Sequence, residues 1–253
     1  YIEYLYERLN RRGFLLRDIK RLVNRDRNVF SACMVATGDA DAMVTGVTRH
    51  YWRALKNVRR VIDPLPGKRP FGMSIIVTKG RTVFMADTTV NESPSAEDLA
   101  EIAEVAADYV CRLGHDPRVA FLSFSNFGNP PSKKTKHIQR AVEILDEKGV
   151  GFEYDGEMQA DVALNEELRE LYPFSKLSGP ANILVMPALH SANIAYKLLA
   201  ELGGGKVIGP VLLGMSHSIQ IARVQSTASD LVNIAGFAAS SSRVLEQIRK
   251  EIE

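Results

Sequence analysis

Helical and strand-like segments alternate along this chain, and turn-forming residues separate them. Residues 42–45 and 119–125 have the apolar, partly β-branched character of buried strands, while residues 95–113 carry apolar side chains at helical spacing after a Ser-Ala-Glu-Asp capping box. Because a helix between two strands usually joins parallel neighbours, the alternation predicts an α/β fold with largely parallel sheets and flanking helices.

One hairpin pattern and a repeat of the alternation complete this prediction. Residues 73–77 and 82–86 read as two strands joined by Lys79-Gly80-Arg81, so a mixed sheet is expected. The last third is predicted to contain strands at residues 182–186 and 207–213 and helices at residues 191–202 and 227–238. With 253 residues, the chain is long enough for one large domain or two subdomains that share a core.

Charge and cysteine content narrow the classes of function. The formal net charge is +2, so the global basic field of a nucleic-acid-binding protein is missing and we expect no nucleic-acid partner. Cys33 and Cys111 are the two cysteines and do not form a C-x-x-C pair, which argues against a disulfide framework or a zinc site. The five histidines are scattered, and His190 and His217 are interpreted as structural or surface groups. We therefore predict no metal site.

The chain termini and hydropathy indicate a cytoplasmic location. No apolar run approaches the roughly 18 residues of a spanning helix, and the N-terminus has no signal-peptide pattern. We therefore expect no membrane association. The sequence begins without Met, inside an apparent helix, which suggests a fragment of a longer polypeptide.

A candidate anion site begins at the helix after Met186-Pro187. Spacing predicts that one face of this helix packs in the core and that Asn193, Tyr196 and Lys197 share the other face. Backbone N–H groups and the positive end of the helix dipole favour an anion there, and Lys197 adds a charge suited to phosphate. An ordinary surface face is the commoner interpretation of such a pattern. The residues expected in the core are Ile194, Ala195, Leu198, Leu199 and Leu202.

Two further polar groups have a structural and a functional interpretation. Asp230 fits a capping box with Thr227, and this role is favoured over a carboxylate that takes a proton from a thiol. Ser123 and Ser125 end a predicted strand beside Gly128, where a hydroxyl and backbone amides could hold a phosphoryl or carbonyl oxygen, although Gly also simply forms turns. The sequence contains no phosphate-binding P-loop, dinucleotide fingerprint, nucleophile elbow or H-E-x-x-H motif.

These segments together resemble the phosphate acetyl/butyryl transferase family over nearly the whole chain. The resemblance implies transfer of an acyl group between CoA and phosphate, in a cleft between two α/β subdomains of the fold shared with isocitrate and isopropylmalate dehydrogenases. It also implies a homodimer, and a domain over residues 1–253 that lacks its N-terminal portion. The matching segments are residues 39–46 (DADAMVTG), 86–87 with 94–103, 117–125 (PRVAFLSFS), 155–157 (DGE), 186–197 (MPALHSANIAYK) and 230–233 (DLVN).

The resemblance supplies a ligand-binding set and also shows where reaction groups are lost. Counting back from Asp230, the family Ser and Arg that stabilise the reacting groups fall on Arg223 and Val224. Lys56 takes the place of another family Arg, and Ala188 that of a family Asp. We therefore expect no competent catalytic residue, with Asp230 retained. The residues expected to bind acyl-CoA or phosphate are Ser125, Gly128, Asn193, Tyr196, Lys197, Asp230 and Asn233.

A second resemblance is to the transferase-like domain at the C-terminus of large bacterial NADP-dependent malic enzymes. It is carried by residues 48–51 (TRHY), 60–64 (RVIDP), 152–158 (FEYDGEM) and 187–192 (PALHSA). This resemblance implies a domain that senses acetyl-CoA and contributes to oligomerisation. Oxidative decarboxylation of malate to pyruvate, with NADP and a divalent metal, would belong to upstream domains outside this chain, and no cofactor is expected here.

Three hypotheses follow from the sequence. The first is a regulatory domain of a malic enzyme that binds acetyl-CoA or a related acyl-CoA without transferring the acyl group. The second is an active phosphate acetyltransferase, in which Asp230 activates the CoA thiol and Arg223 or a neighbouring Arg replaces the missing clamp. The third is a structural dimerisation module, in which Asp230 is only a helix cap.

Overall fold

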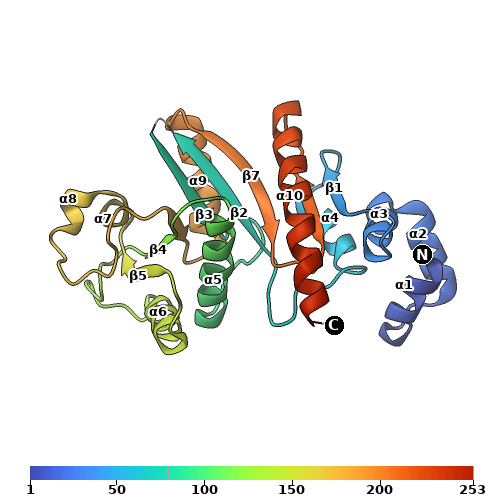
Figure 1. Cartoon of the computed structure of the whole chain (residues 1–253), viewed down its shortest axis with the longest axis horizontal. Coiled ribbons are helices and arrows are strands. Elements are labelled where there is room, and N and C mark those ends of the chain that lie inside the picture. The colour runs from blue at the N-terminus through green and yellow to red at the C-terminus, as the bar shows by residue number, and fades with distance from the viewer. Residues whose placement is uncertain (79, 253) are drawn as a thin grey trace. The chain divides into compact units, whose positions relative to one another are not determined.

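The structure, a computed structural model, describes residues 1–78 and 80–252, so Lys79 of the predicted hairpin turn lies outside the described residues. The chain divides into two units, one built from residues 1–70 and 209–252 and the other from residues 71–208 (Figure 1). Each unit is described below by itself.

A six-stranded sheet organises the unit of residues 71–208. Three neighbouring pairs are parallel, and β2 pairs with β3 as an antiparallel hairpin from Met73↔Ala86 to Thr78↔Arg81. This confirms the predicted mixed, largely parallel sheet. The strands lie in the order β5 (Glu153–Met158), β4 (Arg118–Leu122), β6 (Ile183–Val185), β3 (Arg81–Ala86), β2 (Phe71–Thr78) and β7 (Lys206–Leu213), and β7 leads the chain out of this unit.

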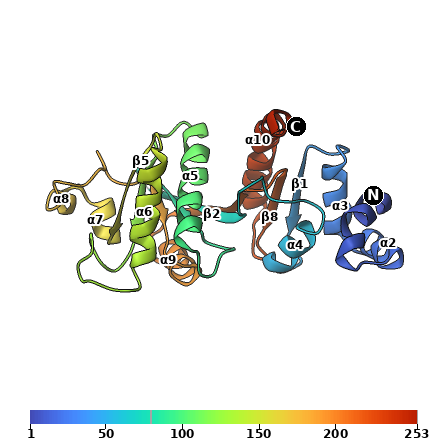
Figure 2. The same ribbon diagram turned by 90° about the horizontal axis from the view of Figure 1, so that it is seen from below.

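Helices cover both sides of this sheet. Figure 2 shows α5 and α9 on opposite sides of its strands. The predicted capping box of α5 is confirmed, because Ser95 Oγ accepts from the Asp98 N–H at 3.2 Å and the Asp98 carboxylate accepts from the Ser95 N–H at 3.0 Å. The helices are α5 (Ala96–Arg112), α6 (Lys136–Lys148), α7 (Ala160–Leu164), α8 (Glu166–Arg169) and α9 (Leu189–Leu202).

The predicted division of α9 into a core face and a polar face is wrong. Ala192 and Tyr196 are the residues of α9 that are buried, and both belong to a core cluster that also contains Met85, Leu122 and Leu184. Tyr196 follows Ala192 by about one helical turn, so both side chains lie on the same face of α9. Sequence spacing alone cannot show which of two apolar faces of a helix meets the sheet. The apolar side chains left exposed are Ile194, Leu198, Leu199 and Leu202.

A two-stranded parallel sheet and α10 form the centre of the other unit. Strand β1 pairs with β8 in register from Ala42↔Ser218 to Gly46↔Ala222, and α10 contacts both strands. Figure 1 shows the N-terminal helices beyond α4 at one side of this unit. The elements are α1 (Ile2–Leu9), η1 (Asn10–Arg12), α2 (Leu16–Arg25), α3 (Arg27–Ala36), β1 (Ala42–Gly46), α4 (Tyr51–Val58), β8 (Ser218–Ala222) and α10 (Ala228–Ile252).

Two strands were not predicted, because polar residues interrupt their apolar pattern. Strand β5 buries Asp155 and Glu157, and strand β8 buries Gln220. Each polar group is tolerated through hydrogen bonds; for example, the Gln220 amide bonds to both the N–H and the C=O of Leu212, at 2.9 and 3.0 Å. Strand β4 ends at Leu122, so Ser123 and Ser125 lie in the loop that follows it.

The corrected orientation of α9 can be tested by stability. Replacing the buried ring in Tyr196→Ala should lower the free energy of unfolding by about 3 kcal/mol, in the range measured for large buried aromatic residues. Leu202→Ala, at a side chain that is 82% exposed, should change it by no more than about 0.5 kcal/mol. Urea unfolding followed by circular dichroism measures both, and the reverse ranking would contradict this orientation.

Candidate functional site

The loop after β4 holds a carboxylate of the protein itself. The Ser125 hydroxyl donates to Glu157 Oε1 at 2.7 Å, and the Gly128 N–H donates to the same oxygen at 2.9 Å. Ser125 and Glu157 are fully buried. The structure therefore brings Ser125 and Gly128 together as predicted, but both of these donors are already used by Glu157.

Further hydrogen bonds fix this loop to the end of β5. The Ser123 N–H donates to Met158 O at 2.9 Å and the Phe127 N–H to Glu157 O at 2.7 Å. The side chain of Gln159 donates to Phe124 O at 2.8 Å. Phe127 has a φ of 49°, a left-handed conformation that is uncommon outside glycine. The carboxyl ends of β4 and β5 are thus joined by two main-chain hydrogen bonds and one hydrogen bond from a side chain.

A cavity of about 460 Å³ opens beside this loop, at the carboxyl ends of β4 and β6. We call it the edge pocket. The carboxyl edge of a parallel sheet is where α/β folds commonly bind ligands. The edge pocket is lined by Leu122, Ser123, Phe124, Lys134, Thr135, Ile138, Ala160, Met186, Pro187 and Ser191.

The predicted residues of α9 lie in different environments. The Asn193 amide donates to Thr88 O over 3.5 Å, and Lys197 is exposed. Tyr196 lies in the core cluster, so its aromatic ring packs between the helix and the sheet. Asn193 is therefore the member of this set that contacts the loop after β3.

Asp87, directly after β3, anchors that loop and was not predicted as a site residue. Its carboxylate accepts from the N–H groups of Gly72 at 3.0 Å, Thr89 at 2.8 Å and Asn91 at 2.6 Å. Burial raises the pKa of Asp87, while these hydrogen bonds oppose the rise. A polar residue that immediately follows a strand was the signal available in the sequence for this group.

The other unit holds the second half of the predicted set, and the predicted cap is confirmed there. The Asp230 carboxylate accepts from the Thr227 N–H at 2.8 Å and from the Thr227 hydroxyl at 2.9 Å, while the Asp230 N–H donates to Thr227 Oγ1 at 3.2 Å. Asn233 follows one helical turn later on α10. Asp230 thus sits at the start of α10 with its carboxylate engaged by the preceding residues.

Unsatisfied polar atoms mark the segment that leads into α10. Arg223 Nε, Ser226 Oγ and Asn233 Nδ2 are buried and have no hydrogen-bond partner among the described residues. Val224, at the place of the family Arg, is 51% exposed. Buried donors without acceptors are uncommon in native structures, so these atoms identify a place where a ligand or water could bind.

A second cavity, of about 510 Å³, lies beside the first turns of α10 within this unit. Leu231 and Ala235 line it together with Arg27, Asn28 and Arg49. Arg49 donates to the Asp26 carboxylate at 2.6 Å, so its charge is partly balanced. Asn28 is buried and its Nδ2 has no partner within the described part of the chain. Arg27, Arg49 and the Asn28 amide therefore supply donors to one part of the cavity, while Val44, Val47, Leu231 and Ala235 supply apolar surface.

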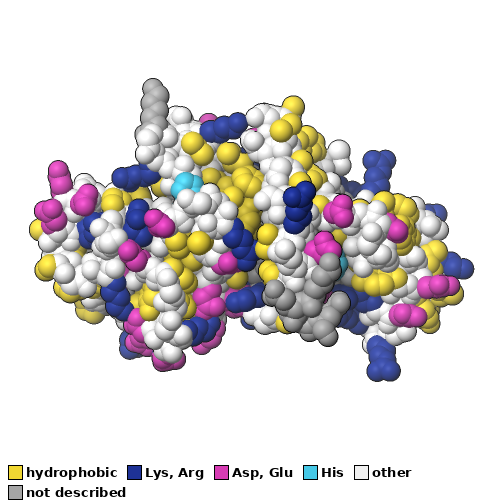
Figure 3. All heavy atoms as spheres, viewed as in Figure 1, with side chains coloured by type: hydrophobic (Ala, Val, Ile, Leu, Met, Phe, Trp, Pro, Cys, Tyr) yellow, Lys and Arg dark blue, Asp and Glu magenta, His cyan; other side chains and the backbone are white. Residues whose placement is uncertain are grey.

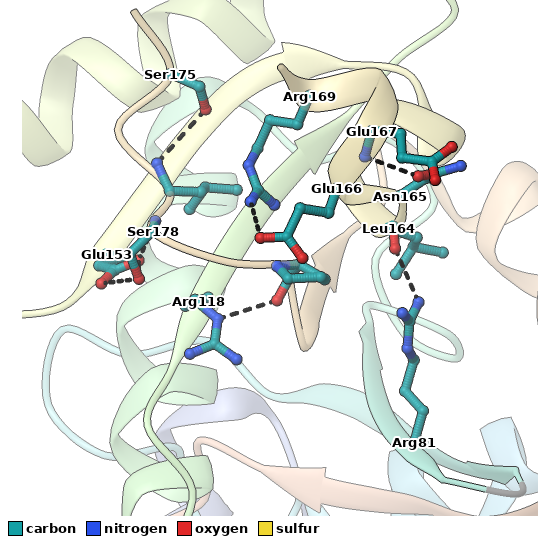
Figure 4. A network of polar contacts seen from close by, with 12 residues as sticks. Arg81, Arg118, Glu153, Leu164, Asn165, Glu166, Glu167, Arg169, Ser175 and Ser178 are labelled. Carbon is teal, nitrogen blue, oxygen red and sulfur yellow. Dashed lines mark hydrogen bonds and ion pairs between the residues drawn. The ribbon is translucent and has the colours of Figure 1, made fainter. Parts of the chain in front are cut away.

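Three arginines form a separate polar cluster in the unit of residues 71–208 (Figure 4). Arg81 donates to Leu164 O at 3.0 Å and Arg118 donates to Pro180 O at 3.0 Å. The buried Arg169 lies 3.6 Å from the Glu166 carboxylate. Because Arg81 and Arg118 bond to backbone carbonyl oxygens, they join α7 and the loop before β6 to the sheet, while the pair of Arg169 and Glu166 lies within α8.

The wider surface adds little to these sites. On the face seen in Figure 3, basic side chains are interspersed with acidic ones. Across residues 1–78 and 80–252, no three His, Cys, Asp or Glu side chains gather in a position to hold a metal ion. None of the described helices is both long and apolar enough to cross a membrane.

The fold and these sites define a class of protein, an α/β protein with an isocitrate dehydrogenase-like fold and cavities at the ends of its strands. A 4-hydroxythreonine-4-phosphate dehydrogenase from Klebsiella pneumoniae shares this fold, with a TM-score of 0.53 at 13% identity over 85% of this chain and 69% of that chain. Residues 1–239 match the phosphate acetyl/butaryl transferase family, and the chain belongs to that family.

Relatives within the family include two kinds of protein. An NADP-dependent malic enzyme of Rhizobium meliloti is 57% identical over 94% of this chain, which covers 31% of that protein. A phosphate acetyltransferase of Bacillus subtilis is 32% identical over 91% of this chain and 72% of that protein. A phosphotransacetylase from Streptococcus pyogenes has a TM-score of 0.88 at 30% identity, over 95% of this chain and 74% of that structure.

The chain therefore spans about a third of the malic enzymes that it matches, and the match covers their C-terminal third. This confirms the resemblance found in the sequence. The chain is homologous to the transferase-like C-terminal region of those enzymes.

The role of Glu157 as an internal hydrogen-bond acceptor can be tested by two substitutions. Glu157→Ala removes the acceptor of the buried Ser125 hydroxyl and of the partly buried Gly128 N–H, and should lower the free energy of unfolding by about 2–4 kcal/mol, since each unsatisfied buried group costs about 1–3 kcal/mol. Glu157→Gln keeps one acceptor oxygen and should remain within about 1 kcal/mol of the wild-type protein. Urea unfolding measures both, with Glu170→Ala as the exposed control, and equal values for Glu157→Ala and the control would contradict the assignment.

Proposed function

We propose that this chain is the acetyl-CoA-sensing regulatory and oligomerisation domain of an NADP-dependent malic enzyme, without transferase activity of its own. The observation that carries the proposal is the 57% identity to the C-terminal third of a malic enzyme, against 32% to a phosphate acetyltransferase. Malate decarboxylation, NADP and a divalent metal would belong to domains outside this chain.

The substitutions beside α10 support binding without transfer. In the family, an Arg stabilises the negative charge that develops during transfer, and Val224 stands at that place when positions are counted back from Asp230. Removing a comparable charge-stabilising donor costs about 2.7–4 kcal/mol in enzymes where this has been measured. Arg223, Lys56 and Ala188 also replace a family Ser, Arg and Asp, so four groups would have to be compensated.

The position of Asp230 points the same way. Its carboxylate accepts two hydrogen bonds from Thr227 at the start of α10, which favours the role of a helix cap. A general base must be within hydrogen-bond reach of the proton it removes, and a carboxylate that caps a helix has less capacity left for that task. Binding without proton transfer needs no such base.

Groups suited to an anionic ligand remain in each unit. Lys197 on α9 is exposed, and Arg27 and Arg49 line the cavity beside α10. Asn233 Nδ2 is a buried donor without an acceptor among the residues described. These donors match the phosphate groups of an acyl-CoA.

Regulation requires that the ligand favours one conformation of the assembly. A coupling free energy of about 1–3 kcal/mol between the acetyl-CoA site and the malic enzyme site is typical of allosteric proteins. We propose a homodimer within a larger oligomer as that assembly, and the cytoplasm as its location. The partners are then acetyl-CoA, a second copy of this chain and the upstream malic enzyme domains.

An active phosphate acetyltransferase is the second candidate, and one observation favours it. Arg223 lies in the turn between β8 and α10, next to Val224, and its Nε is buried without a partner in the described structure. Arg223 precedes the place of the missing family Arg by one residue. A shift of the backbone by one residue would bring its charge to that place. Asp230 would then accept the proton of the CoA thiol.

Two measurements on the purified chain separate these functions. We expect calorimetric titration to show acetyl-CoA binding, and we expect no acetyl phosphate to form from acetyl-CoA and phosphate. Absence of binding would contradict both functions. Turnover at ordinary enzymatic rates, on the order of 1–10³ per second, that is lost in Arg223→Ala would support the transferase instead.

Lys197 should contribute to this binding through its charge. Lys197→Ala should weaken acetyl-CoA binding by about 3–10-fold, because a charge-assisted contact to phosphate is typically worth about 1 kcal/mol or more. Lys20→Ala, at an exposed lysine of α2, is the matched control and should leave the dissociation constant unchanged. Titration calorimetry at two salt concentrations measures both. Equal affinities of the two variants would remove Lys197 from the site.

A further inference from the structure

The hydroxyl groups of the edge pocket share one property that restricts its ligand. Ser123, Thr135 and Ser191 line the pocket, and each hydroxyl has a single hydrogen to donate. If that hydrogen is bound to an acceptor of the protein, the oxygen can only accept from a ligand. The direction of each hydroxyl can be read from its neighbours.

Thr135 and Ser191 both donate to backbone carbonyl oxygens. The Thr135 hydroxyl donates to Ser132 O at 3.0 Å, one turn before α6, and the Ser191 hydroxyl donates to Ala188 O at 2.7 Å at the start of α9. Carbonyl oxygens accept and never donate, so these directions are fixed. Both oxygens therefore offer lone pairs.

The direction of Ser123 is fixed by the buried carboxylate. Ser125 donates its only hydrogen to Glu157 at 2.7 Å, so in the 3.2 Å contact between the two serine oxygens Ser123 is the donor. Glu157 thus orients a chain of two hydroxyls that ends at the pocket. The Ser123 oxygen accepts weakly from the Ser125 N–H at 3.4 Å and keeps capacity for a further donor.

The remaining lining is apolar apart from one cation. Leu122, Ile138, Met186 and Pro187 supply hydrocarbon surface, and Lys134, which is exposed, carries the charge. A phosphate or free carboxylate offers acceptors, so inside this pocket it would face hydroxyl oxygens that have no hydrogen to give. The ligand portion that fits is an apolar chain with N–H or O–H donors, joined to an anionic group beside Lys134.

We propose that the edge pocket binds the pantetheine arm of the acyl-CoA, with its amide N–H groups donating to the oxygens of Ser123, Thr135 or Ser191. This inference rests on the proposed function and assigns one part of the ligand to one cavity. Pantetheine is a flexible, largely apolar chain with two secondary amides, and in CoA it is joined to a diphosphate. The volume of about 460 Å³ falls within the roughly 300–1,000 Å³ of small-molecule sites.

Two variants of the whole chain test this assignment by titration calorimetry with acetyl-CoA. Ala160→Trp places a large ring in the pocket from an exposed position and should weaken binding more than about tenfold, a loss above about 1.4 kcal/mol. Ser123→Ala removes one acceptor and should weaken it about 3–10-fold. Ala239→Trp, at an exposed position of α10, is the control and should bind as the wild-type chain does.

Fragments of the ligand distinguish failure of this inference from failure of the proposed function. Adenosine 3′,5′-bisphosphate, which lacks the arm, should bind the Ala160→Trp variant and the wild-type chain equally. Pantetheine, detected by ligand-observed NMR, should bind the wild-type chain and not the Ala160→Trp variant. If acetyl-CoA binds with unchanged affinity to Ala160→Trp and Ser123→Ala, the arm lies elsewhere and this inference is overturned.

If the wild-type chain does not bind acetyl-CoA, the proposed function is contradicted. The experiment with pantetheine then tests the edge pocket separately. Pantetheine binding that is lost in Ala160→Trp supports a donor-bearing chain as the ligand of the edge pocket. Absence of pantetheine binding overturns the inference as well.

Discussion

The wall of the edge pocket in the unit of residues 71–208 depends on two hydrogen bonds to the Glu157 carboxylate. This carboxylate lies at the end of β5, fully buried, and accepts from the Ser125 hydroxyl and the Gly128 N–H. Burying a polar group is costly unless hydrogen bonds compensate it, so the loop after β4 must keep the shape that presents the two donors to Oε1. That loop forms one wall of the edge pocket, and the direction of its hydroxyl groups follows from the same carboxylate.

The two candidate cavities have opposite hydrogen-bonding character. Hydroxyl oxygens that can only accept line the edge pocket, whereas Arg27, Arg49 and the Asn28 amide supply donors to the cavity beside α10. The edge pocket therefore suits a ligand portion that donates hydrogen bonds, and the cavity beside α10 suits one that accepts them. Binding and transfer use different atoms, so the loss of groups that stabilise a reaction does not by itself remove ligand binding.

The sequence predicted the mixed sheet, the hairpin and the cap at Asp230, since each has a local pattern of its own. It failed for α9, where Tyr196 packs in the core and Leu202 is exposed, because two apolar stripes on one helix cannot be ranked without the sheet they meet. It also missed β5 and the role of Glu157, whose acceptor function depends on residues about 30 positions away. Contacts of this kind leave no periodic signal.

Hydrogen–deuterium exchange of the whole chain, with and without saturating acetyl-CoA, tests the central claim that a retained pocket binds this ligand. The account predicts slower amide exchange on binding in three segments: residues 121–137, residues 186–197 and the first turns of α10. These are the segments that carry the edge pocket, the start of α9 and the retained Asp230. Unchanged exchange in all three segments would contradict the account.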